Sequence, residues 1–222
     1  MRRLVALFGV MGMLTVTAGR ARAQATQDNR LWVSAAAEAE LTERLRADLE
    51  QELRLGTEAG FVETYTQLGL RVKVLAYLHL GAAYRYIAFD GETRHRGLGD
   101  VLVPVDLGKV ALQYRVRFQG TTREQDDTQY TVRNRLKLEV NAPKKLTPFL
   151  GAEIFYQVSP NAEYRERRIF VGVAWQALKK LELAAYYLNQ HEANVSMPEA
   201  NHVLVLEVAY RLREVAGRNG GE

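Results

Sequence analysis

The chain has 222 residues, no cysteine and a formal net charge of +4 at pH 7. This length favours a single domain, and the lack of cysteine excludes a fold held together by disulfides. The charge excess is small, so it does not by itself indicate a nucleic-acid partner.

The first residues have the pattern of a secretory signal. Arg2 and Arg3 precede the short apolar run Leu4–Val16, and Ala21-Arg22-Ala23 offers a cleavage site of the A-x-A type. The run is shorter than the ~20 residues that a membrane-spanning helix needs. We therefore expect residues 1–23 to be a signal peptide and the chain to be exported, which argues further against a nucleic-acid partner.

Most of the remaining chain alternates with a period of two residues, which is typical of β-strands with one apolar and one polar face. In Lys109–Gln119, one face carries Val110, Leu112, Tyr114, Val116 and Phe118, and the other carries charged and polar groups. In chain order, the predicted strands are Trp32–Leu41, Leu45–Leu55, Thr64–Val74, Leu78–Tyr86, Glu92–Asp106, Lys109–Gln119, Tyr130–Asn141, Thr147–Val158, Arg168–Trp175, Lys180–Gln190 and Asn201–Leu212.

Two segments complicate this assignment. Ala35–Leu55 is rich in good helix formers, and Leu41, Leu45, Leu49 and Leu53 recur every four residues as they do on a helix face. We predict strands there, because Ala47 and Leu55 fit only the two-residue period. In Glu92–Asp106, Pro104 cannot donate to a sheet, so we expect a local irregularity.

Amphipathic strands behind a secretory signal predict an all-β fold: an antiparallel up-and-down transmembrane β-barrel of about ten to twelve strands, formed by residues 24–222 with a short polar C-terminal tail. The segments above number eleven, and bacterial single-chain barrels have even numbers, so we expect ten or twelve. We also expect short turns at one rim and longer loops at the other. Two aromatic girdles are predicted from Tyr77, Phe149 and Trp175 near the turns and Tyr130, Tyr156 and Tyr186 toward the loops.

Several short motifs occur along the chain in an order that is similar to their order in a known protein family. They are Trp32, Glu92-x-Arg94 after Tyr84–Tyr86, Tyr114-Arg115-x-Arg117, Arg133-x-Arg135, Ala152-Glu153-x-Phe155, and Arg167-Arg168 leading to Gly172. With them, the chain resembles the domain-of-unknown-function 2490 family of bacterial outer-membrane β-barrel proteins. The resemblance covers the whole mature chain and implies fold and location, but no activity.

The polar face is the candidate functional feature. If the strands around residue 120 pair as a hairpin, Arg115, Arg117, Arg133 and Arg135 crowd one inner wall, and like charges side by side need carboxylates or an anion among them. Glu139 and Glu153 are the nearest candidates in the sequence, so these six residues form the predicted lumen ion network. A network that closes the barrel is the favoured interpretation, and a narrow polar pore is the other.

Groups for catalysis are sparse. After the signal, the serines are Ser34, Ser159 and Ser196, and only Ser196 shares a predicted loop with a histidine, His191. We expect no enzyme activity, no cofactor and no metal site. An outer-membrane lipid-modifying hydrolase, which would need a Ser–His pair, therefore has little support.

A soluble periplasmic β-sandwich or lipocalin-like binding protein has the same alternation with its apolar face turned inward, and it is the main alternative to a membrane barrel. For the membrane barrel, the expected location is the outer membrane. Its expected partners are outer-membrane lipid and the barrel assembly machinery, and a small anionic solute is a candidate ligand.

Overall fold

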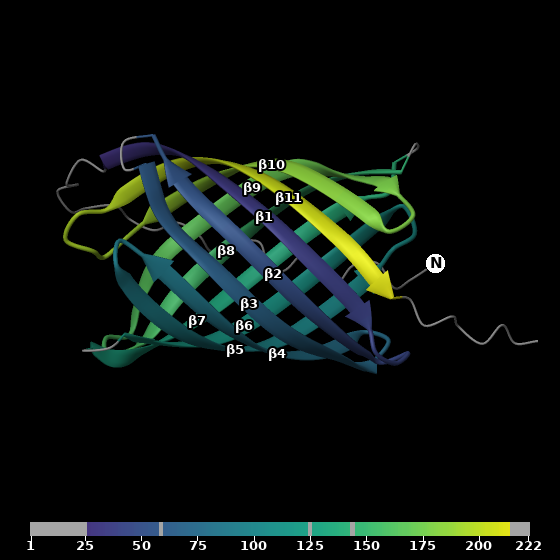
Figure 1. Cartoon of the computed structure of the whole chain (residues 1–222), viewed down its shortest axis with the longest axis horizontal. Helices are drawn as coiled ribbons and strands as arrows, with labels where there is room; N and C mark the ends of the chain where they lie inside the picture. The colour runs from purple at the N-terminus through teal and green to yellow at the C-terminus, as the bar shows by residue number, and fades with distance from the viewer. Residues whose placement is uncertain (1–25, 58–59, 124–125, 143–144, 214–222) are drawn as a thin grey trace, which may run out of the picture.

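The computed structural model describes residues 26–57, 60–123, 126–142 and 145–213 (Figure 1). The predicted signal peptide and residues 214–222 of the predicted tail lie outside these ranges. The described residues include no helix with the length and hydropathy needed to cross a membrane. They form eleven strands: β1 (Thr26–Glu40), β2 (Leu45–Gly56), β3 (Gly60–Leu75), β4 (Leu78–Phe89), β5 (Glu92–Asp106), β6 (Val110–Arg123), β7 (Asp126–Val140), β8 (Leu146–Ser159), β9 (Glu163–Leu178), β10 (Leu181–Glu192) and β11 (Glu199–Arg213).

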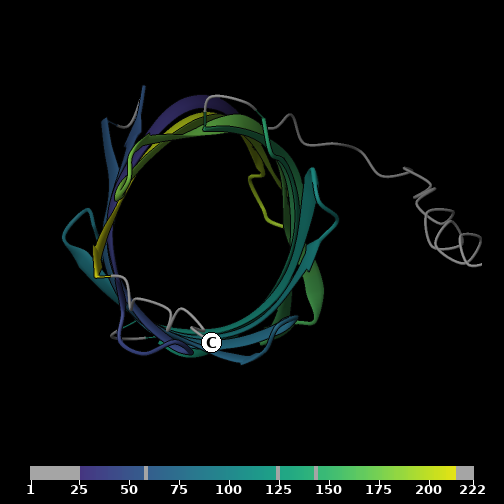
Figure 2. The same cartoon turned by 90° about the vertical axis from the view of Figure 1, so that its right-hand side faces the viewer.

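The strands close into one barrel, which Figure 2 shows from the end where β11 terminates. Each strand pairs antiparallel with the next, and β1 pairs with β11 in parallel, from Thr26↔Glu199 to Ala39↔Arg213. The predicted all-β barrel of about ten to twelve strands is thus confirmed. The expectation of an even number is wrong, because a parallel seam lets an up-and-down barrel close with eleven strands.

The barrel has two rims, which we name by the chain ends nearest to them. At the N rim β1 begins, and the connections there are 57–59, 90–91, 124–125, 160–162 and 193–198. At the C rim β11 ends, and the connections there are 41–44, 76–77, 107–109, 141–145 and 179–180. The predicted difference in loop length between the rims is therefore wrong. The polar segments assigned to loops continue the hairpins instead, as the pairs Gly120↔Tyr130 and Thr121↔Gln129 show.

The apolar rows face outward and the polar rows face inward. On β3, for example, Leu68 is 60% exposed, whereas its neighbour Gln67 is 6% exposed. On β6, Tyr114 and Phe118 are exposed and Arg117 is buried. The predicted sidedness of these strands is confirmed, and so is the β-structure of Ala35–Leu55, which forms β1, a turn and β2.

Two further expectations need correction. β5 is regular at Pro104, which pairs with Gln113 without a register shift. Pro104 lies beyond His79↔Leu102, the last β4–β5 pair toward the C rim, so no β4 carbonyl needs a proton from it. In the predicted girdles, Tyr77, Trp175, Tyr130 and Tyr156 are exposed. Phe149 and Tyr186 instead point inward, where their rings lie 5.5 Å apart, edge to face.

Candidate functional site

The hairpin of β6 and β7 brings the four predicted arginines together. Its register places Arg115 directly opposite Arg135 and Arg117 directly opposite Arg133. Directly opposed like charges destabilise a strand pair, so each guanidinium needs a carboxylate partner nearby. The structure supplies these partners from the two flanking strands, β5 and β8.

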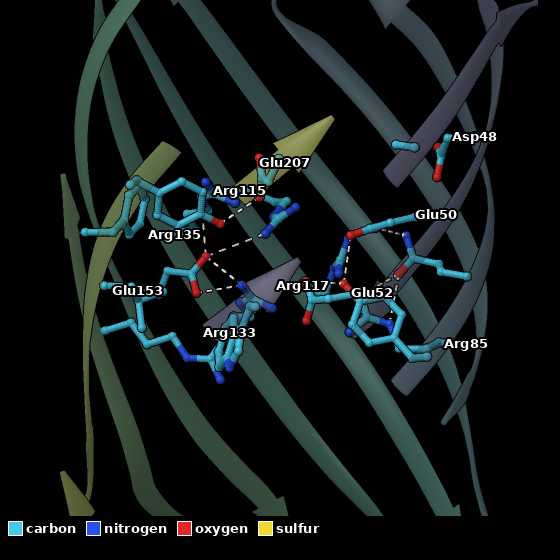
Figure 3. A pocket seen from close by; sticks show the side chains of 18 of the residues that line it. Asp48, Glu50, Glu52, Arg85, Arg115, Arg117, Arg133, Arg135, Glu153 and Glu207 are labelled. Atoms are coloured by element: carbon cyan, nitrogen blue, oxygen red, sulfur yellow. Dashed lines mark hydrogen bonds and ion pairs between the residues drawn. The ribbon is translucent and has the colours of Figure 1, made fainter. Parts of the chain in front are cut away.

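Glu153 on β8 is the centre of the arrangement (Figure 3). Its carboxylate oxygens accept hydrogen bonds from Arg133 Nη2 at 2.6 and 2.7 Å, and Arg135 Nε lies 3.3 Å away. Arg115 Nη2 is 3.7 Å from the same carboxylate. The Glu153 side chain is only 2% exposed, so one desolvated carboxylate serves three guanidiniums. We call Arg115, Arg133, Arg135 and Glu153 the Glu153 cluster.

The other two predicted residues have different partners. Arg117 donates through Nε and Nη2 to the two oxygens of Asp100 on β5, at 2.6 and 2.7 Å. Glu139 pairs with Lys137 on its own strand at 2.6 Å, nearer to the C rim. The structure therefore brings four of the six predicted residues into one cluster. Asp100 was missed, although its place opposite Arg117 follows from the β5–β6 register.

A second layer, absent from the sequence-based prediction, lies on the N-rim side of this cluster. It is a chain of arginines stacked on aromatic rings. Arg133 and Arg168 lie over Phe155 at 4.8 and 4.7 Å, and Arg168 also lies 5.1 Å from the Trp32 ring. The remaining members are Arg54, which lies over Trp32 and Tyr65 at 4.0 and 5.6 Å, and Arg85, which lies over Tyr65 at 3.6 Å. We call this set the arginine–aromatic layer.

The layer crosses the interior of the barrel. Arg168 belongs to β9 and Trp32 to β1, and the two strands are separated in the ring by β10 and β11. Trp32 and Tyr65 are each only 4% exposed, so their rings are enclosed. Stacking of a guanidinium on a ring is most favourable where water is excluded, so these contacts should stabilise the packing of the layer.

The interior between β1 and β8–β11 is packed with apolar side chains. Phe149, Phe170, Leu188, Val203 and Val205 form one buried cluster with Trp32 and Ala174. Val203 and Val205 have no exposed surface. This part of the interior is therefore a hydrophobic core, and charged side chains from most strands, including Glu153 on β8 and Glu207 on β11, fill the rest.

The charged part of the described interior contains cavities, and two of them concern the site. One has a volume of about 210 Å³ and contacts both the arginine–aromatic layer and the Glu153 cluster. The other has a volume of about 350 Å³ and lies toward the C rim, with His79, Leu102 and Glu182 in its lining. Charged side chains at this level remain partly buried, with Lys137 and Glu139 19% and 20% exposed.

The described residues contain no group of three or more histidines and carboxylates placed to hold a metal ion. In the same part of the chain, no hydrogen bond joins a histidine to a serine. His95 and His202 instead pair with the hydroxyl groups of Tyr84 and Tyr187 near the outer surface.

The comparisons with known proteins assign the chain to a family. A family model described as "Protein of unknown function (DUF2490)" matches residues 29–201, which confirms the resemblance inferred from the motifs. No curated protein matches the chain. Among solved structures, an anion-selective porin from Comamonas acidovorans is similar, with a TM-score of 0.41 and 14% sequence identity. The similarity covers 74% of this chain and 55% of the porin chain, so this chain spans about half the length of that porin. On the strength of the family match, the chain belongs to the DUF2490 family of proteins of unknown function.

Proposed function

We propose that this protein is an outer-membrane β-barrel whose interior is closed by its own side chains, so that it is not an open channel. The location is supported by the outward apolar rows, which include Leu68, Leu150 and Val171, each more than half exposed. Leaving so much apolar surface in water is unfavourable, whereas a lipid bilayer accommodates it. Outer-membrane lipid and the barrel assembly machinery are the partners that this location requires.

The orientation of the side chains argues against the soluble alternatives. A lipocalin-like barrel turns its apolar rows inward to bind a ligand, whereas here Leu150 and Val171 face outward and Glu153 and Arg168 face inward. A β-sandwich has two separate sheets, whereas these strands form one closed ring. The exported soluble binding protein is therefore the weaker proposal.

The contact of Arg168 with Trp32 across the interior carries the proposal of a closed barrel. A water-filled pore would need an open path through this level, where aromatic rings and guanidiniums are stacked in contact. On the C-rim side, the Glu153 cluster adds charged side chains from β6, β7 and β8 to the interior. The narrow polar pore inferred as an alternative would need a path past both sets of side chains.

Two measurements test the proposal. In cell fractionation, the protein should sediment with outer membranes, and the unboiled protein should migrate faster in gel electrophoresis than the boiled protein. Recovery in the soluble periplasmic fraction, without heat-dependent mobility, would contradict the location. In planar bilayers, the purified protein should give no steady conductance. A large, steady, anion-selective current would instead establish a porin.

A further inference from the structure

The cavity near the C rim, which we call the C-rim chamber, has charged walls of opposite sign. Glu182 on β10, Glu207 on β11, Glu38 on β1 and Glu50 on β2 form an acidic wall of four consecutive strands in the ring. The chamber has a volume of about 350 Å³, which lies within the range of small-molecule sites that begins at about 300 Å³.

The basic wall lies mainly across the ring. Arg115 on β6 and Arg135 and Lys137 on β7 contribute three positive charges, and Arg71 on β3 contributes a fourth. Asp100 also lines the chamber, but both of its oxygens bind Arg117. The other charged lining residues are four basic and four acidic. Several of them also have partners outside the lining: Arg115 and Arg135 share Glu153, Lys137 pairs with Glu139, and Glu38 pairs with Arg46. The two signs lie on different sides of the chamber, so its walls have opposite polarity.

Several of these groups lack partners, although polar groups in a protein interior normally have them. The Nε of Arg115 and the Nε2 of His79 are buried and form no hydrogen bond within the described part of the chain. Within the same residues, Arg71 and Glu182 take part in no hydrogen bond or ion pair. Nitrogen atoms of Arg115 and His79 without partners thus line the chamber, and a carboxylate without a donor lies on its acidic side.

We propose that the C-rim chamber binds a small zwitterion, with the anionic group of the ligand at Arg115, Arg135 and Lys137 and its ammonium group at Glu182 and Glu207. A simple anion would be attracted by one wall and repelled by the other. A molecule that carries both charges matches both walls, because complementary potentials favour association and like charges oppose it. Amino-acid-like compounds of dipeptide size fit the volume.

Isothermal titration calorimetry on the purified full chain in detergent tests this inference. Alanyl-alanine and phosphoethanolamine serve as zwitterionic probes. N-acetyl-alanyl-alanine and alanyl-alanine amide are matched controls that each lack one charge. At least one zwitterion should bind, and alanyl-alanine should bind at least tenfold more tightly than its two derivatives if it is the one that binds. No saturable binding of either zwitterion, or equal affinity for the derivatives, would overturn the proposal.

Variants locate the site. Lys137→Gln and Glu182→Gln should each weaken binding about tenfold, since each removes one charge-assisted contact, while Lys137→Arg and Glu182→Asp should retain most of it. Arg165→Gln is the matched control, because Arg165 pairs with Glu163 near the N rim, far from the chamber. Wild-type affinity in both Gln variants would refute the site. Heat-dependent mobility verifies that each variant is folded. Binding in detergent is independent of location and conductance, so its failure is distinguishable from failure of the proposed function.

Discussion

Glu153→Gln is the most direct test of the charged interior. The change keeps the size of the side chain and one carbonyl oxygen, but it removes the only carboxylate within 4 Å of Arg115, Arg133 and Arg135 among the described residues. Arg133 keeps its own charge, but its partner at 2.6 and 2.7 Å becomes neutral. Arg115 and Arg135, which are directly opposite each other, are left without compensation.

The expected cost is large. The amide nitrogen of Gln cannot accept a hydrogen bond, so Arg133 loses one of its two acceptor oxygens, and a bond to a charged group contributes about 1.5–3 kcal/mol. Repulsion among the uncompensated guanidiniums adds to this loss. The total should approach the 3–5 kcal/mol that is typical when one partner of a buried ion pair is removed.

Urea titration of the barrel folded in lipid vesicles measures the free energy of unfolding. Glu40→Gln is the control, since Glu40 and Arg46 are both 36% exposed and lie 3.4 Å apart, and such a pair should contribute only about 0–1 kcal/mol. Conductance that appears in Glu153→Gln and not in the unmodified protein would further support a closing role. Equal unfolding free energies for the two variants would refute the reasoning, because the Glu153 cluster would then have no special energetic role.

Much of the fold could be predicted from alternation alone. A period of two assigns every side chain of a strand to one face, so a few apolar positions such as Val110 and Phe118 determine the sidedness of the whole segment. The closure of the ring could not be inferred in this way, because the pairing of β1 with β11 depends on how the last strand meets the first. Loop lengths were misjudged because polar residues continue the β6–β7 hairpin toward the N rim.

The contacts of the candidate site are likewise of two kinds: those that local strand pairing predicts and those that it does not. The crowding of Arg115 and Arg135 follows from one hairpin, so local pairing was enough to anticipate it. The arginine–aromatic layer joins β9 to β1 across the interior, and no local pattern specifies such a contact. One signal was nevertheless present: the alternation that turns Val33 outward turns Trp32 inward, and a large aromatic ring in a polar row needs a partner.

The remaining predictions test the outer face, the arginine–aromatic layer and the packing of the interior. Leu68→Arg should lower the free energy of unfolding by about 2–4 kcal/mol near the bilayer midplane, because Leu68 faces outward. Gln113→Arg should have a small effect on the same quantity, because Gln113 lines the C-rim chamber. Equal urea midpoints for the two variants would contradict the assigned sidedness. Trp32→Ala should cost about 3–5 kcal/mol and produce bilayer conductance, and a stable variant that remains silent would show that the layer does not close the barrel. Gly172→Ala should prevent normal folding, because a Cβ there would lie 2.2 Å from the Cβ of the Tyr186 side chain and 2.5 Å from a backbone oxygen. Gly97→Ala is its control, since a Cβ there meets nothing within 4 Å, and alanine in a strand should be neutral or stabilising by up to about 1 kcal/mol. Because backbone on the neighbouring strand cannot retreat without breaking the ladder, the two alanine variants should differ in heat-dependent mobility; if both fold alike, the close approach of β9 and β10 at this level is not a requirement of the barrel.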